Sequence, residues 1–290
     1  MIPSVSVTGR RRVLVAVLVV SLIVVGSAIV TLVTRNGGLR AAPALVQGTI
    51  LEVQGGSASR ISVAGDNMEV IVGSSPSLTS ASIVVGSGGF HRDFRAKTGT
   101  FGLRLDKAAA LQTGARRLTI VVPENGILTL TLVGEARVVL DQARLGELFL
   151  AGASSALELD ASEPGSIIDL VQIENVTGGF SATRLGNLDM ADLVIGNITG
   201  SYDLDFSGSL DRHCDVSLRT AVGNGTVRIP SKPGVQLSIG SVLGKVLSSD
   251  FVAEGSKSFL NASAAGGADR QLIVHIDSAI GQIRLVEVQQ

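Results

Sequence analysis

The chain has 290 residues, of which 45% are hydrophobic, and its net charge at pH 7 is -1. A chain of this length and composition can bury a substantial core, and its near-neutral charge excludes the basic surface that binds DNA or RNA, so we expect no nucleic-acid partner. Aromatic residues make up only 3%, and Cys214 is the single cysteine. An internal disulfide is therefore excluded, and we expect no cofactor.

Residues 13–34 carry no charge and form a continuous apolar stretch. At 1.5 Å per residue, a helix of about 22 residues crosses a hydrocarbon core of roughly 30 Å. Arginines occupy positions 10–12 before this stretch, whereas only Arg35 and Arg40 follow it closely. The positive-inside rule therefore predicts a single-pass transmembrane helix in the cell membrane, with residues 1–12 in the cytoplasm and the rest of the chain extracytoplasmic.

A cleaved signal peptide is the alternative, because it also combines a basic start with an apolar run. The run is longer than the apolar core of an ordinary signal peptide, and the only small-x-small cleavage pattern that follows it, residues 42–44, lies far downstream with a proline in its middle. We expect an uncleaved anchor. Residues 35–44, rich in Gly, Ala and Pro, are typical of a linker, and the folded domain is predicted to span residues 45–290.

The first part of this domain, up to Pro123, contains short apolar segments separated by Gly and Ser clusters. These segments predict irregularly spaced strands. Residues 116–134 then predict two strands around a turn at residues 123–126, where proline presets φ and glycine relieves the bend.

From Leu128 onward, segments of alternating apolar and polar residues recur, and each ends at a glycine. Strict alternation puts one apolar face toward a core, so each segment predicts a half-buried strand, and the glycine marks where the chain turns. Such units bury their apolar faces only by stacking, which predicts an all-β, right-handed β-helix-like solenoid. An antiparallel sandwich is the alternative, since it also contains many short strands. The turning glycines are predicted at Gly134, Gly152, Gly178, Gly196, Gly223, Gly244 and Gly281.

Four segments carry a resemblance to a known family, namely residues 117–140, 145–162, 216–246 and 272–288. Their apolar alternation, their turning glycines and the prolines after their strands resemble the toast-rack and adhesin-head β domains of bacterial membrane-anchored envelope proteins, which include proteins of the cell-wall stress response. The resemblance covers most of the predicted domain. It implies an extracytoplasmic β domain, and it offers no catalytic motif to transfer.

The densest group of metal-ligand side chains is Asp211, His213 and Asp215, which lie two residues apart and would share one face of a strand. Asp203 and Asp205 are predicted to stack near them, and carboxylates with an imidazole can bind a divalent cation. The spacing matches no established metal motif. We therefore favour a solvated acidic face and assign no metal ion.

Paired carboxylates are what acid–base cleavage of a glycosidic bond requires, and two such pairs occur, Glu158 with Asp160 and Asp203 with Asp205. The same pairs arise on any outward strand face. The chain is also poor in the aromatic residues that would bind sugar rings. We therefore expect no catalytic site.

Cys214 lies at strand spacing from Val216 and Leu218, which are expected to face the core. Only Arg212 and His213 are close enough in sequence to lower the pKa of its thiol. We interpret Cys214 as a small buried hydrophobe rather than a reactive group.

The sequence thus predicts a membrane-anchored β-solenoid that acts as a non-enzymatic interaction or scaffold module at the bacterial cell envelope. A regulatory or sensor subunit of a cell-envelope stress response is the first alternative, and it would contact a membrane protein partner through the small residues 26–28. A carbohydrate-active enzyme is the second. The last segment is expected to form the terminal coil, which can pair with another copy, and Arg284 and Glu287 would discourage this self-association.

Overall fold

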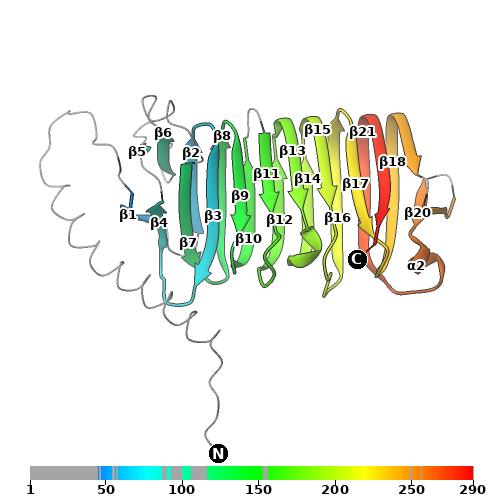
Figure 1. Cartoon of the computed structure of the whole chain (residues 1–290), viewed down its shortest axis with the longest axis horizontal. Helices are drawn as coiled ribbons and strands as arrows, with labels where there is room; N and C mark the ends of the chain where they lie inside the picture. The colour runs from blue at the N-terminus through cyan, green and yellow to red at the C-terminus, as the bar shows by residue number, and fades with distance from the viewer. Residues whose placement is uncertain are drawn as a thin grey trace, which may run out of the picture.

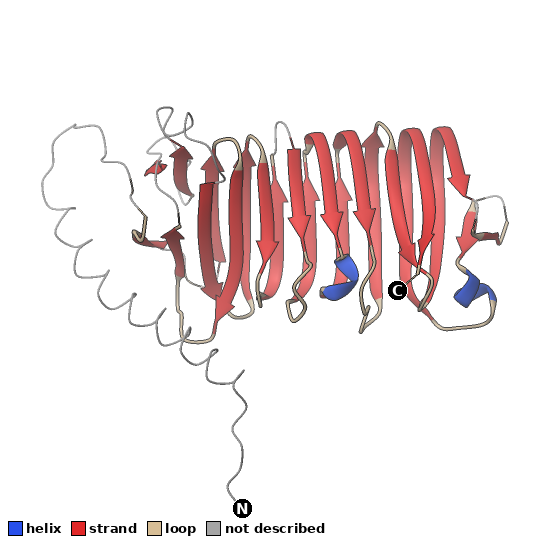
Figure 2. Cartoon of the chain, in the orientation of Figure 1, coloured by secondary structure: helices blue, strands red, loops and turns tan. Residues whose placement is uncertain are grey.

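The structure is a computed structural model that describes residues 45, 47–53, 56, 58–86, 90–92, 100–105, 116–152, 156–248, 250–255 and 257–289. This part of the chain is nearly all β-strand (Figure 2), which confirms the all-β expectation. The predicted cytoplasmic segment 1–12, the predicted helix 13–34 and the linker 35–44 lie outside the described residues. Within the described ranges, no helix has the length and hydropathy that a membrane crossing requires.

The strands follow the apolar alternation of the sequence. The first eight are β1 (Ile50–Val53), β2 (Ala58–Ala64), β3 (Met68–Ser75), β4 (Ala81–Val85), β5 (Phe90–Arg92), β6 (Phe101–Leu105), β7 (Arg116–Pro123) and β8 (Gly126–Val133). The predicted turn between β7 and β8 is confirmed, and Asn125 takes a positive φ of +57° there.

The remaining strands follow at nearly regular intervals. They are β9 (Ala136–Leu140), β10 (Arg144–Ala151), β11 (Ala156–Asp160), β12 (Ile167–Glu174), β13 (Thr177–Thr183), β14 (Asp189–Gly196), β15 (Ile198–Asp205), β16 (Cys214–Val222), β17 (Gly225–Pro230), β18 (Gly234–Ser248), β19 (Val252–Ala253), β20 (Ser258–Leu260) and β21 (Arg270–Val288). A turn of 3₁₀ helix (Leu185–Asn187) and a short helix α2 (Ala262–Ala265) interrupt them.

From β8 to β17, each strand pairs in parallel with the strand two positions later in the chain. The even-numbered strands β8 to β16 form one sheet surface, face A. The odd-numbered strands β9 to β17 form the other, face B. Two consecutive strands therefore make one coil, and the coils stack along the long axis of the molecule (Figure 1). The antiparallel sandwich is wrong for these strands, because none of these pairs runs in opposite directions.

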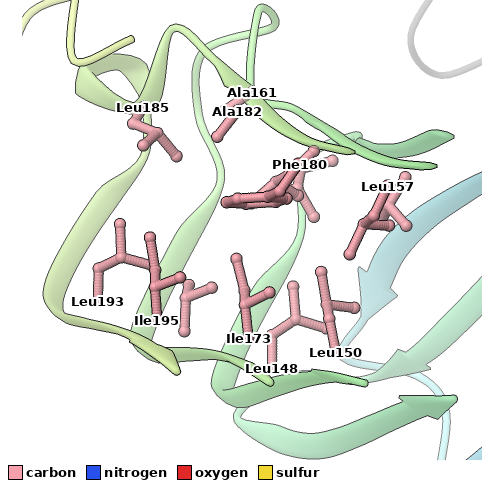
Figure 3. Packing of buried hydrophobic residues seen from close by; sticks show 14 of the residues in the cluster. Leu148, Leu150, Leu157, Ala161, Ile173, Phe180, Ala182, Leu185, Leu193 and Ile195 are labelled. Carbon is pink, nitrogen blue, oxygen red and sulfur yellow. The ribbon is translucent and has the colours of Figure 1, made fainter. Parts of the chain in front are cut away.

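The core lies between the two faces. Leu148 and Leu150 of β10, with Ile173 of β12, point toward Leu157 of β11 and Phe180 of β13 (Figure 3). All five side chains are buried. Burial of one such side chain contributes about 1.5–3 kcal/mol, so the repeated inward columns supply most of the stabilisation.

The chain does not stack its coils in simple sequence order at either end. Near the N-terminus, β2 lies between β6 and β8, and β3 lies between β7 and β9. Near the C-terminus, β21 lies between the coil of β16 and β17 on one side and β18 on the other. The last strand is therefore enclosed, and β18 is the outermost coil.

The prediction that the last segment forms the terminal coil is therefore wrong. The chain forms β18 two positions beyond β17 and then returns through β21, which fills the position between them. Arg284 has register partners on both sides, Thr226 and Leu247, and so does not guard an open edge. Glu287 pairs with Ile229 of β17 and accepts a hydrogen bond from the backbone of Ala262 in α2.

The end of the stack is fixed by a buried asparagine. The side chain of Asn261 accepts hydrogen bonds from the backbone N–H groups of Val235 and Ala264, both at 2.9 Å. Its amide nitrogen donates to the carbonyl oxygens of Pro230 at 3.0 Å and Pro233 at 2.8 Å. One side chain thus joins the end of β17, the start of β18 and helix α2. A buried polar group is stable only with such partners.

A column of stacked glycines forms the corner between the faces. Its members have φ between +108° and +151° and are Gly178, Gly200, Gly223, Gly281 and Gly244. A Cβ atom on Gly223 would lie 1.8 Å from the carbonyl oxygen of Gly200, and one on Gly244 would lie 1.8 Å from that of Gly281. Both the backbone conformation and the close approach of successive coils therefore require glycine.

Six of the seven predicted turning glycines have a positive φ, and Gly196 is the exception. In the coil of β14 and β15, Asn197 makes the turn after β14 with φ +54°, and the glycine of the corner column is Gly200. Asparagine tolerates the left-handed region, so it can replace glycine where no coil presses on its Cβ.

Replacement of Gly223 by alanine is expected to lower the free energy of unfolding by about 2–5 kcal/mol, because the new methyl group is both strained and in collision with Gly200. Urea denaturation of the full chain measures the effect. Gly255→Ala is the matched control, since Gly255 has φ +116° but no atom near its Cβ position. The control should cost only about 1–2 kcal/mol. Equal losses in both variants would contradict the stacking argument.

Candidate functional site

A long hollow lies on face B, across seven strands from β3 to β21, and encloses about 750 Å³. We call it the charged groove. Its residues form a row in which each is the register partner of the next: Glu69, Arg137, Glu158, Ser181, Asp203, Thr226 and Arg284. Neighbouring strands lie about 4.8 Å apart, so the row extends over roughly 29 Å along the molecule.

The floor of the groove is recessed in its middle because the residues that line it there have small side chains or none, namely Gly179, Ser181, Ser201 and Gly225. Beneath it, the buried ring of Tyr202 occupies the space where a Cβ atom of residue 225 would lie. Burial raises the pKa of Tyr202 to about 12, so its hydroxyl stays protonated. The floor is therefore made of backbone and hydroxyl groups over a packed aromatic ring.

Arginines from adjacent strands neutralise the carboxylates of the row. The ion pairs are Glu69 with Arg117, Glu158 with Arg137 at 3.4 Å, and Asp203 with Arg228. Each pair spans neighbouring coils, so it fixes two side chains in one arrangement. The groove therefore presents ordered charges rather than mobile ones.

Asp160 supports this arrangement from beside the row. It accepts hydrogen bonds from Arg137 and from the backbone N–H of Ser162, the latter at 2.9 Å. Burial alone would raise the pKa of Asp160, but the hydrogen bonds from Ser162 and Arg137 outweigh burial and hold the pKa below its usual value. The same hydrogen bond raises the pKa of Arg137. The pair therefore stays ionised throughout the neutral range.

Two charges of the groove are not used in this way. Glu135, the residue before β9, and Arg284, on β21, line the groove near opposite ends. Both side chains are exposed. Neither forms an ion pair with another residue in the described part of the chain. A ligand in the groove would thus meet a free negative charge at one end and a free positive charge at the other.

The structure brings together two of the three residues considered for a metal site. His213 Nε2 lies 3.4 Å from a carboxylate oxygen of Asp215, and His213 Nδ1 lies 3.2 Å from the carbonyl oxygen of Arg270. Asp211 is exposed and does not join them. Among the described residues, no three His, Cys, Asp or Glu side chains are close enough to hold a metal ion.

The two carboxylate pairs considered for catalysis lie on face B, and the carboxylates of each pair already have partners within the chain. Asp160 and Glu158 both contact Arg137. Asp203 contacts Arg228, and Asp205 accepts a hydrogen bond from the backbone N–H of Ser207 at 2.9 Å. A general acid requires a raised pKa, and the shift of Asp160 has the opposite sign.

Cys214 is buried, with 1% of its surface exposed, which confirms its interpretation as a core residue. Burial is the main cause that raises the pKa of its thiol to about 12, and the charges of Asp215 and Asp192 add to it. The thiolate is therefore scarce at neutral pH, and nucleophilic chemistry has no basis here.

The charged groove itself was not predicted. Its signal is nevertheless present in the sequence, because successive members of the row from Arg137 to Thr226 are separated by 21, 23, 22 and 23 residues. An alignment of the sequence in repeats of that length places these residues in one column. Alternation within a single strand shows only that each residue points outward.

No protein-family model matches the chain, and no curated protein matches it significantly. A solved structure of a proposed cell adhesion protein from Clostridium sporogenes matches with 17% identity and a TM-score of 0.38, over 85% of this chain and 99% of that one. A proposed adhesin from Bacteroides fragilis matches with 11% identity and a TM-score of 0.38, over 86% and 100%. Likeness at this level carries no conclusion about this chain, and the resemblance to toast-rack domains stays a prediction.

Replacement of Asp160 by asparagine is expected to lower the free energy of unfolding by about 1–2 kcal/mol at neutral pH, because the ion pair with Arg137 is lost. The loss stays modest because about half of the Arg137 side chain is exposed and water screens the pair. The folded pKa of Asp160 lies below the unfolded value near 3.8, so the contribution is complete above that value and is lost as the pH falls through the folded pKa. The difference between wild type and variant should therefore shrink in acid. Urea midpoints at several pH values measure it. The exposed Glu147 gives a control, Glu147→Gln, and an equal pH dependence for both variants would contradict the assignment.

In the native protein, Cys214 should react with a chromogenic disulfide reagent at least about a hundredfold more slowly than in the urea-unfolded chain, because both the thiolate population and access are low. Single-wavelength kinetics with and without urea measure the ratio. Rapid reaction of the native chain would show that the thiol is accessible and would refute its placement in the core.

Proposed function

We propose that residues 45–290 form a right-handed β-solenoid that works as a non-enzymatic interaction or scaffold module at the bacterial cell envelope, held there by a helix at residues 13–34. The parallel pairing of successive coils supports the solenoid. The uncharged N-terminal run supports the anchor, and the family resemblance of the four segments supports the envelope.

The charged groove is the observation that carries the interaction role. Its walls are strands that hydrogen-bond to neighbours on both sides, and its carboxylates are held by arginines across coils. Such a surface loses little conformational entropy when a partner binds. The partner is expected to be polar and elongated, with a cationic group toward Glu135 and an anionic group toward Arg284.

Catalysis is disfavoured by the same electrostatics. Acid–base cleavage requires one carboxyl group that keeps its proton near neutral pH and a second that does not. Three carboxylates of the groove, those of Glu69, Glu158 and Asp203, are held in ion pairs with arginines. The groove therefore suits recognition better than proton transfer.

A photo-crosslinking experiment in bacterial cells tests the proposal. The full chain carries a photoreactive amino acid either at Ser201, in the groove, or at Ser217, on the outward side of face A. We expect a specific adduct from position 201 only. Arg284→Glu should reduce its yield by about tenfold, which corresponds to loss of one charge-assisted contact. Arg219→Glu, an exposed arginine on face A, is the matched control and should leave the yield unchanged.

Two results would contradict the proposal. Equal adducts from positions 201 and 217 would show that the groove is not the binding surface. Release of sugars from cell-wall glycans by the wild-type chain, abolished by Asp203→Asn, would show that the groove is catalytic.

A further inference from the structure

The outermost strand has an open edge at the C-terminal end of the stack. On the side away from β21, β18 pairs with β20 only at residues 236–238, and Ile239 donates one further hydrogen bond to Lys257. Residues 241–248 have no strand partner on that side within the described residues. Natural proteins usually cover or blunt such an edge, because it can template pairing with another strand.

Apolar side chains gather beside this edge. Val222, Ile280 and Leu243 are register partners on three adjacent strands, and their exposed fractions rise from 38% through 47% to 73% toward the edge. Leu247 is also exposed on the second arm of β18. We call the edge 241–248 together with these four side chains the tip. Among the described residues, most of the large exposed hydrophobics lie at this end, and a cluster of this kind marks an interaction site.

We propose that the tip binds a second copy of the chain, with the two β18 edges paired antiparallel and the two stacks end to end. Strand β18 bends at Gly244, with φ +151°, and its two arms run along face A and face B. A straight strand could therefore pair with only one arm.

A second β18 has the matching bend. A two-fold axis through the corner at Gly244 reverses the strand and lays each arm of one copy on the other arm of its partner. Only this register lets both arms pair, so the corner fixes the alignment to within about one residue. A two-fold interface of this kind is closed, and it leaves no further edge for growth.

Among the described residues, the opposite end of the stack offers no comparable partner. There β1 has four residues and β5 has three. Neither could cover both arms of the edge at residues 241–248. Head-to-tail association into filaments is therefore disfavoured relative to the tip-to-tip pair.

The charges of the edge agree with this register. Lys245 is the only charged residue among residues 241–248. With the corners aligned, it lies opposite Leu243 or Gly244 and not opposite the partner's own lysine. Its alkyl stem can then cover Leu243 while its ammonium group reaches water. A single edge lysine often discourages pairing, but here no like charge opposes it.

Light scattering of the full chain in mild detergent, corrected for bound detergent, tests the pairing. Wild type should form a dimer, and Leu243→Lys should dissociate it with about a hundredfold weaker association, because each new ammonium group then lies opposite the like charge of the partner's Lys245. Ile127→Lys is the matched control, since Ile127 is 38% exposed on β8, far from the tip. Urea midpoints of both variants establish that they fold. A monomeric wild type would overturn the proposal.

Crosslinking locates the contact independently of the charged groove. Cys214 is buried, so Leu243→Cys provides the only accessible thiol among the described residues. A short bis-maleimide should yield a covalent dimer of Leu243→Cys and none of Ile127→Cys. Equal crosslinking of both variants, or a dimer that Leu243→Lys does not weaken, would place the interface elsewhere and refute the tip. Neither outcome depends on whether a partner binds in the groove.

Discussion

The structure depends on the close stacking of each coil directly on the next. Backbone hydrogen bonds join successive coils on both faces, and the corner brings glycine Cα atoms against carbonyl oxygens of the neighbouring coil. Every position in one coil is therefore continued by the equivalent position in the next. The inward columns become aliphatic, the corner becomes glycine, and the outward row on face B becomes the charged groove. All three features are consequences of one register.

Stacking alone would leave the two ends weak, because a terminal coil has a neighbour on one side only. The chain avoids this by inserting strands that are distant in sequence: Cys214 of β16 pairs with Leu272 of β21, and Met68 of β3 pairs with Ala136 of β9. These inserted coils cannot detach without breaking ladders on both sides. The outermost coil is in turn held by β20 and by the hydrogen bonds of Asn261. Non-local pairing of this kind raises the contact order, so folding is expected to be slow relative to a simple repeat.

Alternation in single strands was enough to predict which residues face the core. Leu128 and Leu130 are buried as expected, and so is Cys214. Alternation carries no information about which strand lies beside which, and for that reason the insertion of β21 was missed. The glycine at position 196 was misplaced for a related reason: Asn197 could supply the left-handed turn, and only the contact with Gly178 shows that Gly200 is the corner. The charged groove was missed for the same reason, because its residues come together only when the order of the strands is known.

Face B and the tip differ in whether their groups have partners within the described residues. Along face B the carboxylates find arginines within the chain, whereas at the tip both the backbone edge and the apolar side chains lack partners in the described residues. A two-fold axis at the corner exchanges the two arms of β18, so face A of one copy would continue into face B of the other. The two grooves would then lie on opposite sides of the shared corner, and no straight ligand could run from one into the other. Each groove would bind separately, and pairing at the tip would act through avidity rather than by completing a site.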